Sequence, residues 1–123
     1  MITFDHFKLE EGMPIYLQIL LYIKRGIIAG SIVSGDELPS RRVMSALLGI
    51  NPNTVQKAYR MLEEEGLISS HSGAKSYVDV TEEKIKKVRQ ELMENDAKGI
   101  VTVMKQMGLT KDEAVALIET FWE

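Results

Sequence analysis

The sequence has 123 residues, of which 45% are hydrophobic and 27% charged, a composition that fits one small globular protein. It contains no cysteine, which excludes disulfides and thiolate metal sites. The formal net charge of −3 argues weakly against a nucleic-acid partner, yet residues 38–62 hold Arg41, Arg42, Lys57 and Arg60 and no acid, so this part can attract an anion.

The first part of the chain is predicted to be an arm followed by a helix. Residues 1–13 show a short alternation of apolar residues and are expected to form an extended arm. Pro14 suits the first turn of a helix, and apolar residues then recur at helical spacing. This pattern predicts a helix over about 14–29 that ends at Gly30. Residues 31–39 have turn chemistry and predict a loop.

Two short helices are expected next. The first covers 41–48, because Ser40 is a good N-cap and Gly49 a good helix end. Its residues expected to be buried are Val43, Met44, Leu47 and Leu48. The second helix begins with Asn51 as N-cap and Pro52 at its first position, and Gly66 follows its end. One stripe of this helix is predicted to face the core: Val55, Ala58, Tyr59 and Leu62.

A hairpin and two more helices complete the predicted fold. Residues 67–70 and 76–80 have strand-like composition on either side of a short turn and predict a β-hairpin. A long helix is expected over about 82–107. Thr110 and Glu113 form the pattern of a capping box and predict a last helix. The residues that this helix is expected to bury are Ala114, Leu117, Ile118 and Phe121.

Two helices joined by a short turn, then a hairpin, are the layout of a winged helix-turn-helix. In such folds the second helix enters the major groove of DNA by its N-terminal end. Its outward residues here are Asn53, Thr54, Gln56, Lys57 and Arg60. Amide side chains can pair with an adenine edge, and cations can neutralise phosphates. Three glutamates come only at the end of this helix, over 63–65, which keeps acids away from the groove.

Four segments resemble the GntR family of winged-helix regulators, and most of all its YtrA subfamily. They are "PIYLQI" at 14–19, "LPSRR" at 38–42, "NPNTVQKAYRMLEEEGLI" at 51–68 and "SGAKSYV" at 72–78. The resemblance implies a DNA-binding transcriptional regulator that represses by occluding a promoter. It also implies that Ser40 and Arg42 contact DNA at the start of the first short helix. The family's recognition-helix contacts match Asn53, Thr54 and Gln56 or Lys57, and its wing-tip glycine matches Gly73.

The sequence departs from the family pattern at three places. The family usually has glutamate where Arg41 stands, and arginine where Gln56 stands, so Gln56 replaces a side chain suited to read guanine. The wing, usually Arg-x-Gly-x-Gly, reads His71-Ser72-Gly73-Ala74-Lys75, so the family's arginine and its second glycine are both replaced. The full set of residues predicted to bind DNA is Ser40, Arg41, Arg42, Asn51, Asn53, Thr54, Gln56, Lys57, Arg60, His71, Gly73 and Lys75.

The last two helices are too small to enclose a ligand cavity of ~300–1,000 Å³, so we expect them to form a homodimer. The predicted interface residues are Val88, Leu92, Ile100, Val103, Met104, Met107, Leu117, Ile118, Phe121 and Trp122. A two-fold dimer predicts an inverted-repeat operator. The expected organisation is thus mostly α with a small hairpin: an arm (1–13), a winged helix-turn-helix domain (14–80) and a helical dimerisation tail (81–123).

Other functions are less consistent with the sequence. The only histidines, His6 and His71, have no partner at ligand spacing, so no metal site, cofactor or catalytic centre is expected. The alternative that stays open is a winged helix that binds another protein instead of a specific DNA sequence. No apolar run reaches the ~20 residues of a membrane span, and the N-terminus lacks signal-peptide features, so we expect a cytoplasmic location. The sequence does not identify a small-molecule effector.

Overall fold

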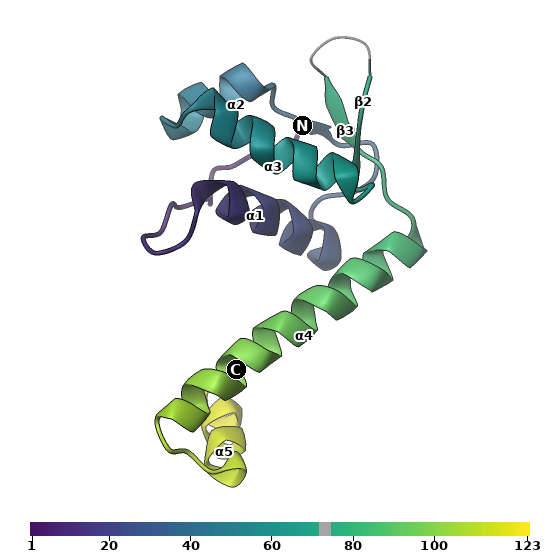
Figure 1. Cartoon of the computed structure of the whole chain (residues 1–123). Coiled ribbons are helices and arrows are strands. Elements are labelled where there is room, and N and C mark those ends of the chain that lie inside the picture. The colour runs from purple at the N-terminus through teal and green to yellow at the C-terminus, as the bar shows by residue number, and fades with distance from the viewer. Residues whose placement is uncertain (72–74) are drawn as a thin grey trace. The chain divides into compact units, whose positions relative to one another are not determined.

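The computed structural model describes residues 1–71 and 75–123, and these form two compact units, Met1–Val88 and Arg89–Glu123 (Figure 1). The described residues contain α-helices and one small antiparallel sheet, in the order α1-β1-α2-α3-β2-β3-α4-α5. This confirms the predicted fold class of a mostly helical protein with a small β element. No helix in the described part of the chain is both long and apolar enough to cross a membrane.

Helix α1 covers Ile15–Ala29 and supplies a large share of the core of the first unit. Ile19, Ile23 and Ile27 recur at helical spacing and are all buried. The helix ends at Gly30, whose φ of 85° lies in the left-handed region that glycine adopts without strain. The predicted bounds are therefore confirmed to within one residue.

Helix α3, Pro52–Glu64, lies at the centre of the first unit and packs against α1, α2 and β2. The predicted apolar stripe is confirmed, since all four of its residues have no exposed surface: Val55, Ala58, Tyr59 and Leu62. Asn51 caps the helix as predicted, because its side chain accepts a 2.8 Å hydrogen bond from the Asn53 N–H. The opposite face of α3 therefore points to solvent.

Helix α2, Arg41–Leu48, has the predicted bounds but buries a different strip of residues. Met44 is fully buried and Leu48 half-buried, whereas Val43 and Leu47 are 49% and 67% exposed. The prediction that Val43 and Leu47 lie in the core is wrong. The physical reason is that α2 packs mainly on one neighbour, α3, and such a helix buries only one row of residues four apart.

The sheet has three strands instead of the predicted two. β2, Ile68–Ser70, and β3, Ser76–Val78, form the predicted hairpin. β1, Glu37–Leu38, lies in the predicted loop and pairs antiparallel with β3, which gives the order β1-β3-β2. A two-residue strand has no periodic pattern of its own, and its backbone is extended because β3 offers partners for its hydrogen bonds.

The N-terminal arm is part of the first unit and packs against α1 and Glu37. Ile2 is buried, and its N–H donates a 2.8 Å hydrogen bond to the Glu37 carbonyl. The rings of Phe4 and Phe7 pack against Tyr22 of α1, with ring centroids 4.7 and 5.3 Å away. The Tyr22 hydroxyl donates a 2.9 Å hydrogen bond to the Thr3 carbonyl. The arm therefore adds apolar cover to α1.

Helix α4, Glu82–Gln106, belongs to the first unit over its first two turns. Val88 is buried in the core of that unit, and Ile85 packs against the same core. The Lys84 ammonium donates a 2.7 Å hydrogen bond to the Gly66 carbonyl just beyond α3, and a 3.3 Å bond to the Asp79 carbonyl. These contacts attach the start of α4 to the end of α3.

The second unit contains the rest of α4 and helix α5, Lys111–Phe121. The capping box of Thr110 and Glu113 is present as predicted, and its hydrogen bonds lower the pKa of the Glu113 carboxyl. The prediction that α5 buries its apolar face is wrong for the single chain, since Leu117, Ile118 and Phe121 are exposed. Two short helical segments offer each other too little surface to cover both apolar faces.

Candidate nucleic-acid interface

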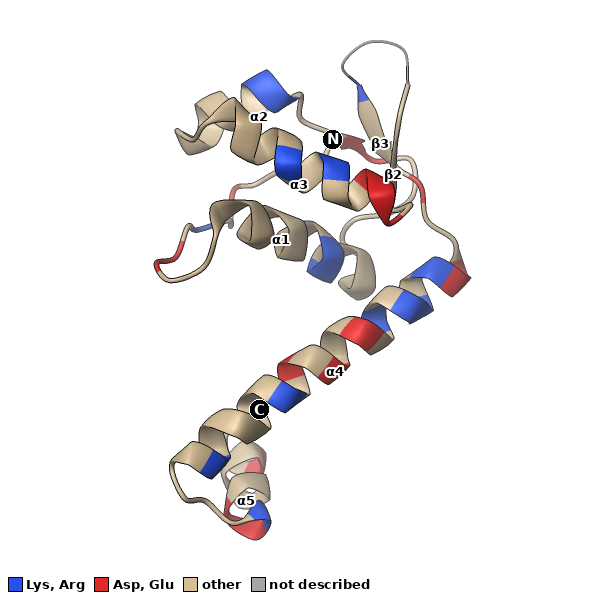
Figure 2. Ribbon diagram, in the orientation of Figure 1, with Lys and Arg blue, Asp and Glu red and all other residues tan. Residues whose placement is uncertain are grey.

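Basic and acidic residues are separated along the helix-turn-helix. Figure 2 shows Lys and Arg at the start of α2 and in the middle of α3, and acids at the end of α3. The first turn of α3 contains no acid and begins with three residues whose side chains lie near or in solvent: Pro52, Asn53 and Thr54. This end of α3 therefore combines the positive end of a helix dipole with a surface free of negative charge, which favours an anion.

The amide side chains of the predicted site have different roles. Asn51 uses its side-chain oxygen to cap α3, so the predicted contact of Asn51 with DNA would have to use its side-chain NH2 group. Asn53 and Gln56 are exposed on the solvent side of α3, and Thr54 is half-buried. Exposed amides one turn from a helix start are suited to pair with base edges.

Two of the predicted cations lie on tyrosine rings. The Lys57 ammonium is 3.9 Å from the centroid of the Tyr16 ring, which belongs to α1. The Arg41 guanidinium carbon is 5.1 Å from the centroid of the Tyr59 ring on α3. Such cation–π contacts hold a charged group in place without neutralising it.

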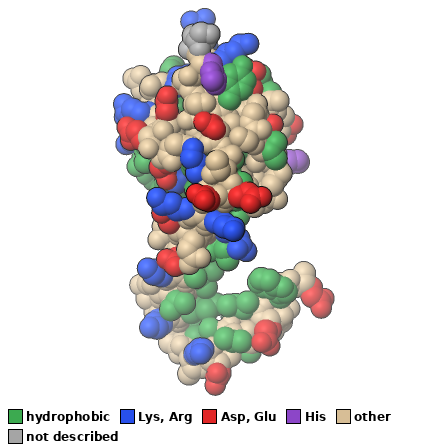
Figure 3. Space-filling model, turned by 90° about the vertical axis from the view of Figure 1, so that its right-hand side faces the viewer, with side chains coloured by type: hydrophobic (Ala, Val, Ile, Leu, Met, Phe, Trp, Pro, Cys, Tyr) green, Lys and Arg blue, Asp and Glu red, His purple; other side chains and the backbone are tan. Residues whose placement is uncertain are grey.

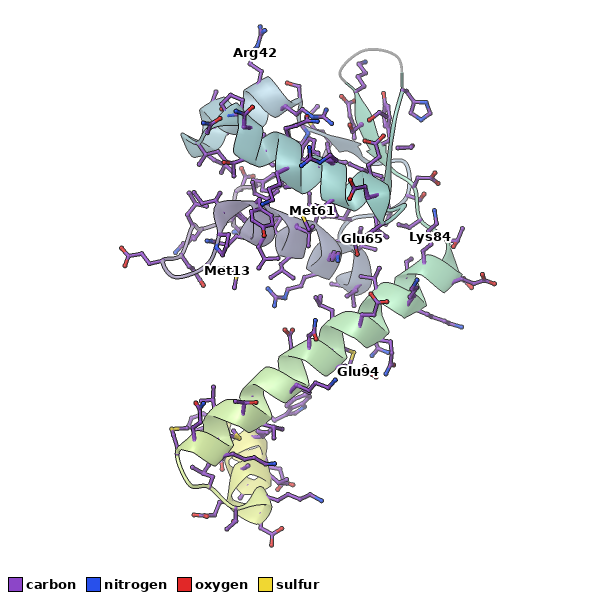
Figure 4. All side chains as sticks on the ribbon, viewed as in Figure 1. Met13, Arg42, Met61, Glu65, Lys84 and Glu94 are labelled. Atoms are coloured by element: carbon purple, nitrogen blue, oxygen red, sulfur yellow. The ribbon has the colours of Figure 1, made fainter. Side chains whose placement is uncertain are left out.

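The other two cations are exposed. Arg42 points away from the helices, as Figure 4 shows. The Arg60 Nε lies 4.0 Å from a carboxylate oxygen of Glu64, one turn further along α3. Both side chains of this pair are well exposed, so solvent screens the attraction and Arg60 stays available to another anion.

Tyr59 links the two helices of the motif. Its hydroxyl donates a 2.7 Å hydrogen bond to the Pro39 carbonyl, directly before the N-cap residue Ser40. Burial raises the pKa of the Tyr59 hydroxyl far above its usual range, and the positive charge of Arg41 opposes this rise. The phenol is therefore neutral, as a hydrogen-bond donor must be.

The glutamates at the end of α3 have structural contacts that the sequence analysis did not predict. Glu65 forms a 2.7 Å ion pair with Lys24 of α1. Lys24 and Glu65 are 41 residues apart, so no local pattern could reveal the pair. Glu65 thus helps to attach α3 to α1, in addition to lying away from the basic end of α3.

The wing is described only in part. His71, directly after β2, and Lys75, directly before β3, are exposed, and the backbone N–H of His71 donates a 3.0 Å hydrogen bond to the Lys75 carbonyl. The His71 and Tyr77 rings make a T-shaped contact, with ring centroids 5.3 Å apart. Gly73, the predicted wing-tip contact, lies outside the described residues. His71 and Lys75 thus present two basic side chains beside the end of β2 and the start of β3.

Comparison with known proteins agrees with this geometry. The uncharacterised HTH-type transcriptional regulator YhcF of Bacillus subtilis strain 168 is 33% identical over 116 residues, which cover 94% of this chain and 96% of YhcF. The HTH-type transcriptional repressor YtrA of the same strain is 41% identical over 69 residues, or 56% of this chain and 53% of YtrA. This chain thus matches about half the length of YtrA.

Solved structures give the same result. A GntR family transcriptional regulator from Listeria monocytogenes has a TM-score of 0.79 and 28% identity, and the match covers 91% of this chain and 98% of that chain. The AraR DNA-binding domain, solved in complex with operator ORX1, has a TM-score of 0.50 and 29% identity over 58% of this chain and 87% of that chain. The family model described as bacterial regulatory proteins, gntR family, matches residues 15–78. The chain therefore belongs to the gntR family of bacterial regulatory proteins and is a helix-turn-helix transcriptional regulator that binds DNA.

Proposed function

We propose that this regulator is a cytoplasmic, homodimeric repressor that binds an inverted-repeat operator and blocks transcription by occupying a promoter. The observation that carries the DNA-binding part is the solvent face of α3, which combines exposed amides and cations with no acid in its first turn. A winged helix that binds a protein would present an apolar or mixed-charge surface there. The name of the relative YtrA, a transcriptional repressor, supports the sign of regulation.

The proposed contacts divide into two classes. Asn53, Thr54 and Gln56 would read base edges, because they lie on the first turns of α3, the part of a recognition helix that enters the major groove. A second class would bind phosphates and fix the position of the domain on the duplex. The members of this second class are Ser40, Arg41, Arg42, Asn51, Lys57, Arg60, His71 and Lys75.

The proposed dimer rests on the exposed apolar surface of the second unit. Figure 3 shows hydrophobic side chains gathered there. Phe121 and Trp122 are 78% and 81% exposed, which is unusual for large aromatic residues of a single chain. Val88 is buried in the first unit and is not available to a partner. The remaining predicted interface residues are half-buried or exposed: Leu92, Ile100, Val103, Met104, Met107, Leu117, Ile118, Phe121 and Trp122.

A two-fold dimer would present two copies of α3 to DNA. Helix-turn-helix dimers bind half-sites about one helical turn apart, or ~34–36 Å, on a palindromic operator. We therefore propose residues 14–80 as the DNA-binding domain and residues 81–123 as a dimerisation tail whose first two turns pack on that domain, preceded by the arm over 1–13.

The experiment that tests the proposal is selection of binding sites from random duplex DNA by the purified protein. Recovery of an inverted repeat is the expected result, because a symmetric dimer reads the same half-site twice. The recovered operator then serves for titrations and for a search of promoters. Recovery of a single half-site would reject the symmetric dimer. Recovery of no motif, with weak binding that salt abolishes, would reject sequence-specific recognition.

A further inference from the structure

At the start of α2, a cation lies over an aromatic ring that α3 holds in a fixed position. Tyr59 has no exposed surface, so core packing holds its ring. The 2.7 Å hydrogen bond from its hydroxyl to the Pro39 carbonyl holds the tip of the side chain. The Arg41 guanidinium carbon lies 5.1 Å from the centroid of this ring. Arg41 is thus restrained by a group that cannot move independently of the helix-turn-helix.

The charge of Arg41 is not neutralised within the part of the chain that the structure describes. Its Nε is buried and has no hydrogen-bond acceptor among residues 1–71 and 75–123. The first turn of α2 contains no acid, and no carboxylate of the described residues pairs with Arg41. By contrast, Lys24 and Arg60 each have a glutamate at the C-terminal end of α3 within 4.0 Å, Glu65 and Glu64 respectively. Arg41 therefore keeps its full attraction for an external anion.

Stability of the free protein does not explain this arrangement. The N-terminus of a helix carries a partial positive charge, so a cation there is unfavourable and an acid would be favourable. A buried donor without an acceptor adds a second cost. Arg42 adds a second cation in the same turn. A bound phosphate would offset the first of these costs, because the helix start and the two guanidinium groups all attract it.

We propose that Tyr59 is a positioning residue that holds the Arg41 guanidinium ready to bind a phosphate of the DNA backbone. This inference rests on the proposed DNA-binding function. A guanidinium that is already ordered loses less freedom on binding, so the contact is stronger than one made by a mobile cation. Held against the ring, Arg41 binds the backbone and does not reach base edges, so it adds affinity without sequence preference.

The first test uses Arg41→Gln, titrated with the selected operator and with an unrelated duplex at several salt concentrations. Loss of one phosphate contact should reduce the magnitude of the slope of log K against log salt by about 0.9. Both duplexes should bind more weakly by the same factor, so the ratio of their affinities stays constant. Lys105→Gln is the matched control, because it removes one exposed charge from α4 and should leave the slope unchanged.

The second test separates the ring from the charge. Arg41→Lys keeps the charge, so its salt slope should equal that of the wild type, but its affinity should fall several-fold because a lysine is not held as a planar group on the ring. Tyr59→Leu should weaken binding in the wild-type background and have no effect in the Arg41→Gln background, since the ring acts through Arg41. Should Tyr59→Leu not fold in a circular dichroism melt, Arg41→Lys decides the question.

Three results would overturn the inference while leaving the proposed function intact. The first is a salt slope of Arg41→Gln equal to that of the wild type. The second is a ratio of operator affinity to unrelated-DNA affinity that changes in Arg41→Gln. The third is an operator affinity of Arg41→Lys equal to that of the wild type. Absence of any preference by the wild-type protein for the selected operator would instead reject the proposed function itself. The two failures are therefore distinguishable in one set of titrations.

Discussion

At the residue scale, two asparagines two positions apart differ in their use. Asn51 accepts a hydrogen bond from the Asn53 backbone N–H and begins α3, while the Asn53 side chain is exposed on the solvent face of that helix. The same residue type therefore stabilises the helix at one position and is available to DNA at the other. The difference follows from the backbone, because Asn51 is the extended N-cap and Asn53 lies within the helix.

This difference gives a paired prediction. Asn53→Ala should relax the sequence preference at one base pair by roughly 1–3 kcal/mol and leave stability nearly unchanged, because it removes a base contact and keeps the backbone donor. Asn51→Ala should lower the free energy of unfolding by about 1 kcal/mol, because α3 loses its cap. Competition binding with operator variants and thermal melts measure both effects. Preference unchanged at every base pair in Asn53→Ala would exclude the base contact.

At the element scale, close packing makes glycine necessary at one position of α1. Gly26 lies in α1, where an added Cβ would meet the side chain of Ile32, with Cγ1 at 2.8 Å and Cδ1 closer still. Ile32 is buried, and its N–H donates a 3.1 Å hydrogen bond to the Gly26 carbonyl. The loop after α1 thus folds back directly over this glycine, and its close approach depends on the missing side chain.

Gly26→Ala should therefore destabilise the protein although alanine is the better helix former. Overpacking against a buried side chain costs typically ~1–3 kcal/mol, which exceeds the gain in helix propensity of up to ~1 kcal/mol. Gly99→Ala is the control, since Gly99 lies in α4 with no atom within 4 Å of an added Cβ, and it should stabilise its helix. Circular dichroism melts compare the two variants. A melting temperature raised equally by both would mean that Ile32 moves aside freely.

At the scale of the whole molecule, the two units bury their apolar residues to different degrees. The first unit has a core that includes Ile19, Met44 and Tyr59, none with exposed surface. In the second unit, Leu117, Ile118 and Phe121 lie on one face of α5 and are all exposed. A single chain leaves this face in water, so the apolar area favours association with a second copy.

Leu117→Asp should accordingly convert the proposed dimer to a monomer. A carboxylate placed in an apolar interface loses its hydration when the dimer forms, which costs at least ~3 kcal/mol of dimerisation free energy. This loss corresponds to a dimer dissociation constant raised more than about 100-fold. Operator affinity should fall with it, because one domain then binds alone. Thr120→Asp introduces the same charge at an exposed position of α5 outside the predicted interface. Sedimentation velocity compares the variants, and a dimer retained in Leu117→Asp would show that α5 is not the interface.

Local patterns in the sequence determined most of the elements. Ser40, Asn51 and Thr110 each cap the helix that the sequence predicts, because capping needs only residues within one turn. The stripe of α3 is likewise predictable, since a helix surrounded by α1, α2 and β2 buries one complete face. The resemblance of four segments to the GntR family also came from the sequence, and the family match over residues 15–78 confirms it.

Contacts between distant segments could be decided only by the tertiary structure. The Lys57–Tyr16 and Arg41–Tyr59 contacts and the Lys24–Glu65 ion pair join residues that are far apart in the chain, and no spacing rule links them. Strand β1 is extended because β3 lies beside it. Val43 and Leu47 are exposed because of where α2 meets its neighbour. Most secondary structure here follows from interactions within a few residues. Whether a charged group is paired, and whether an apolar side chain is buried, depends instead on which distant segment packs against it.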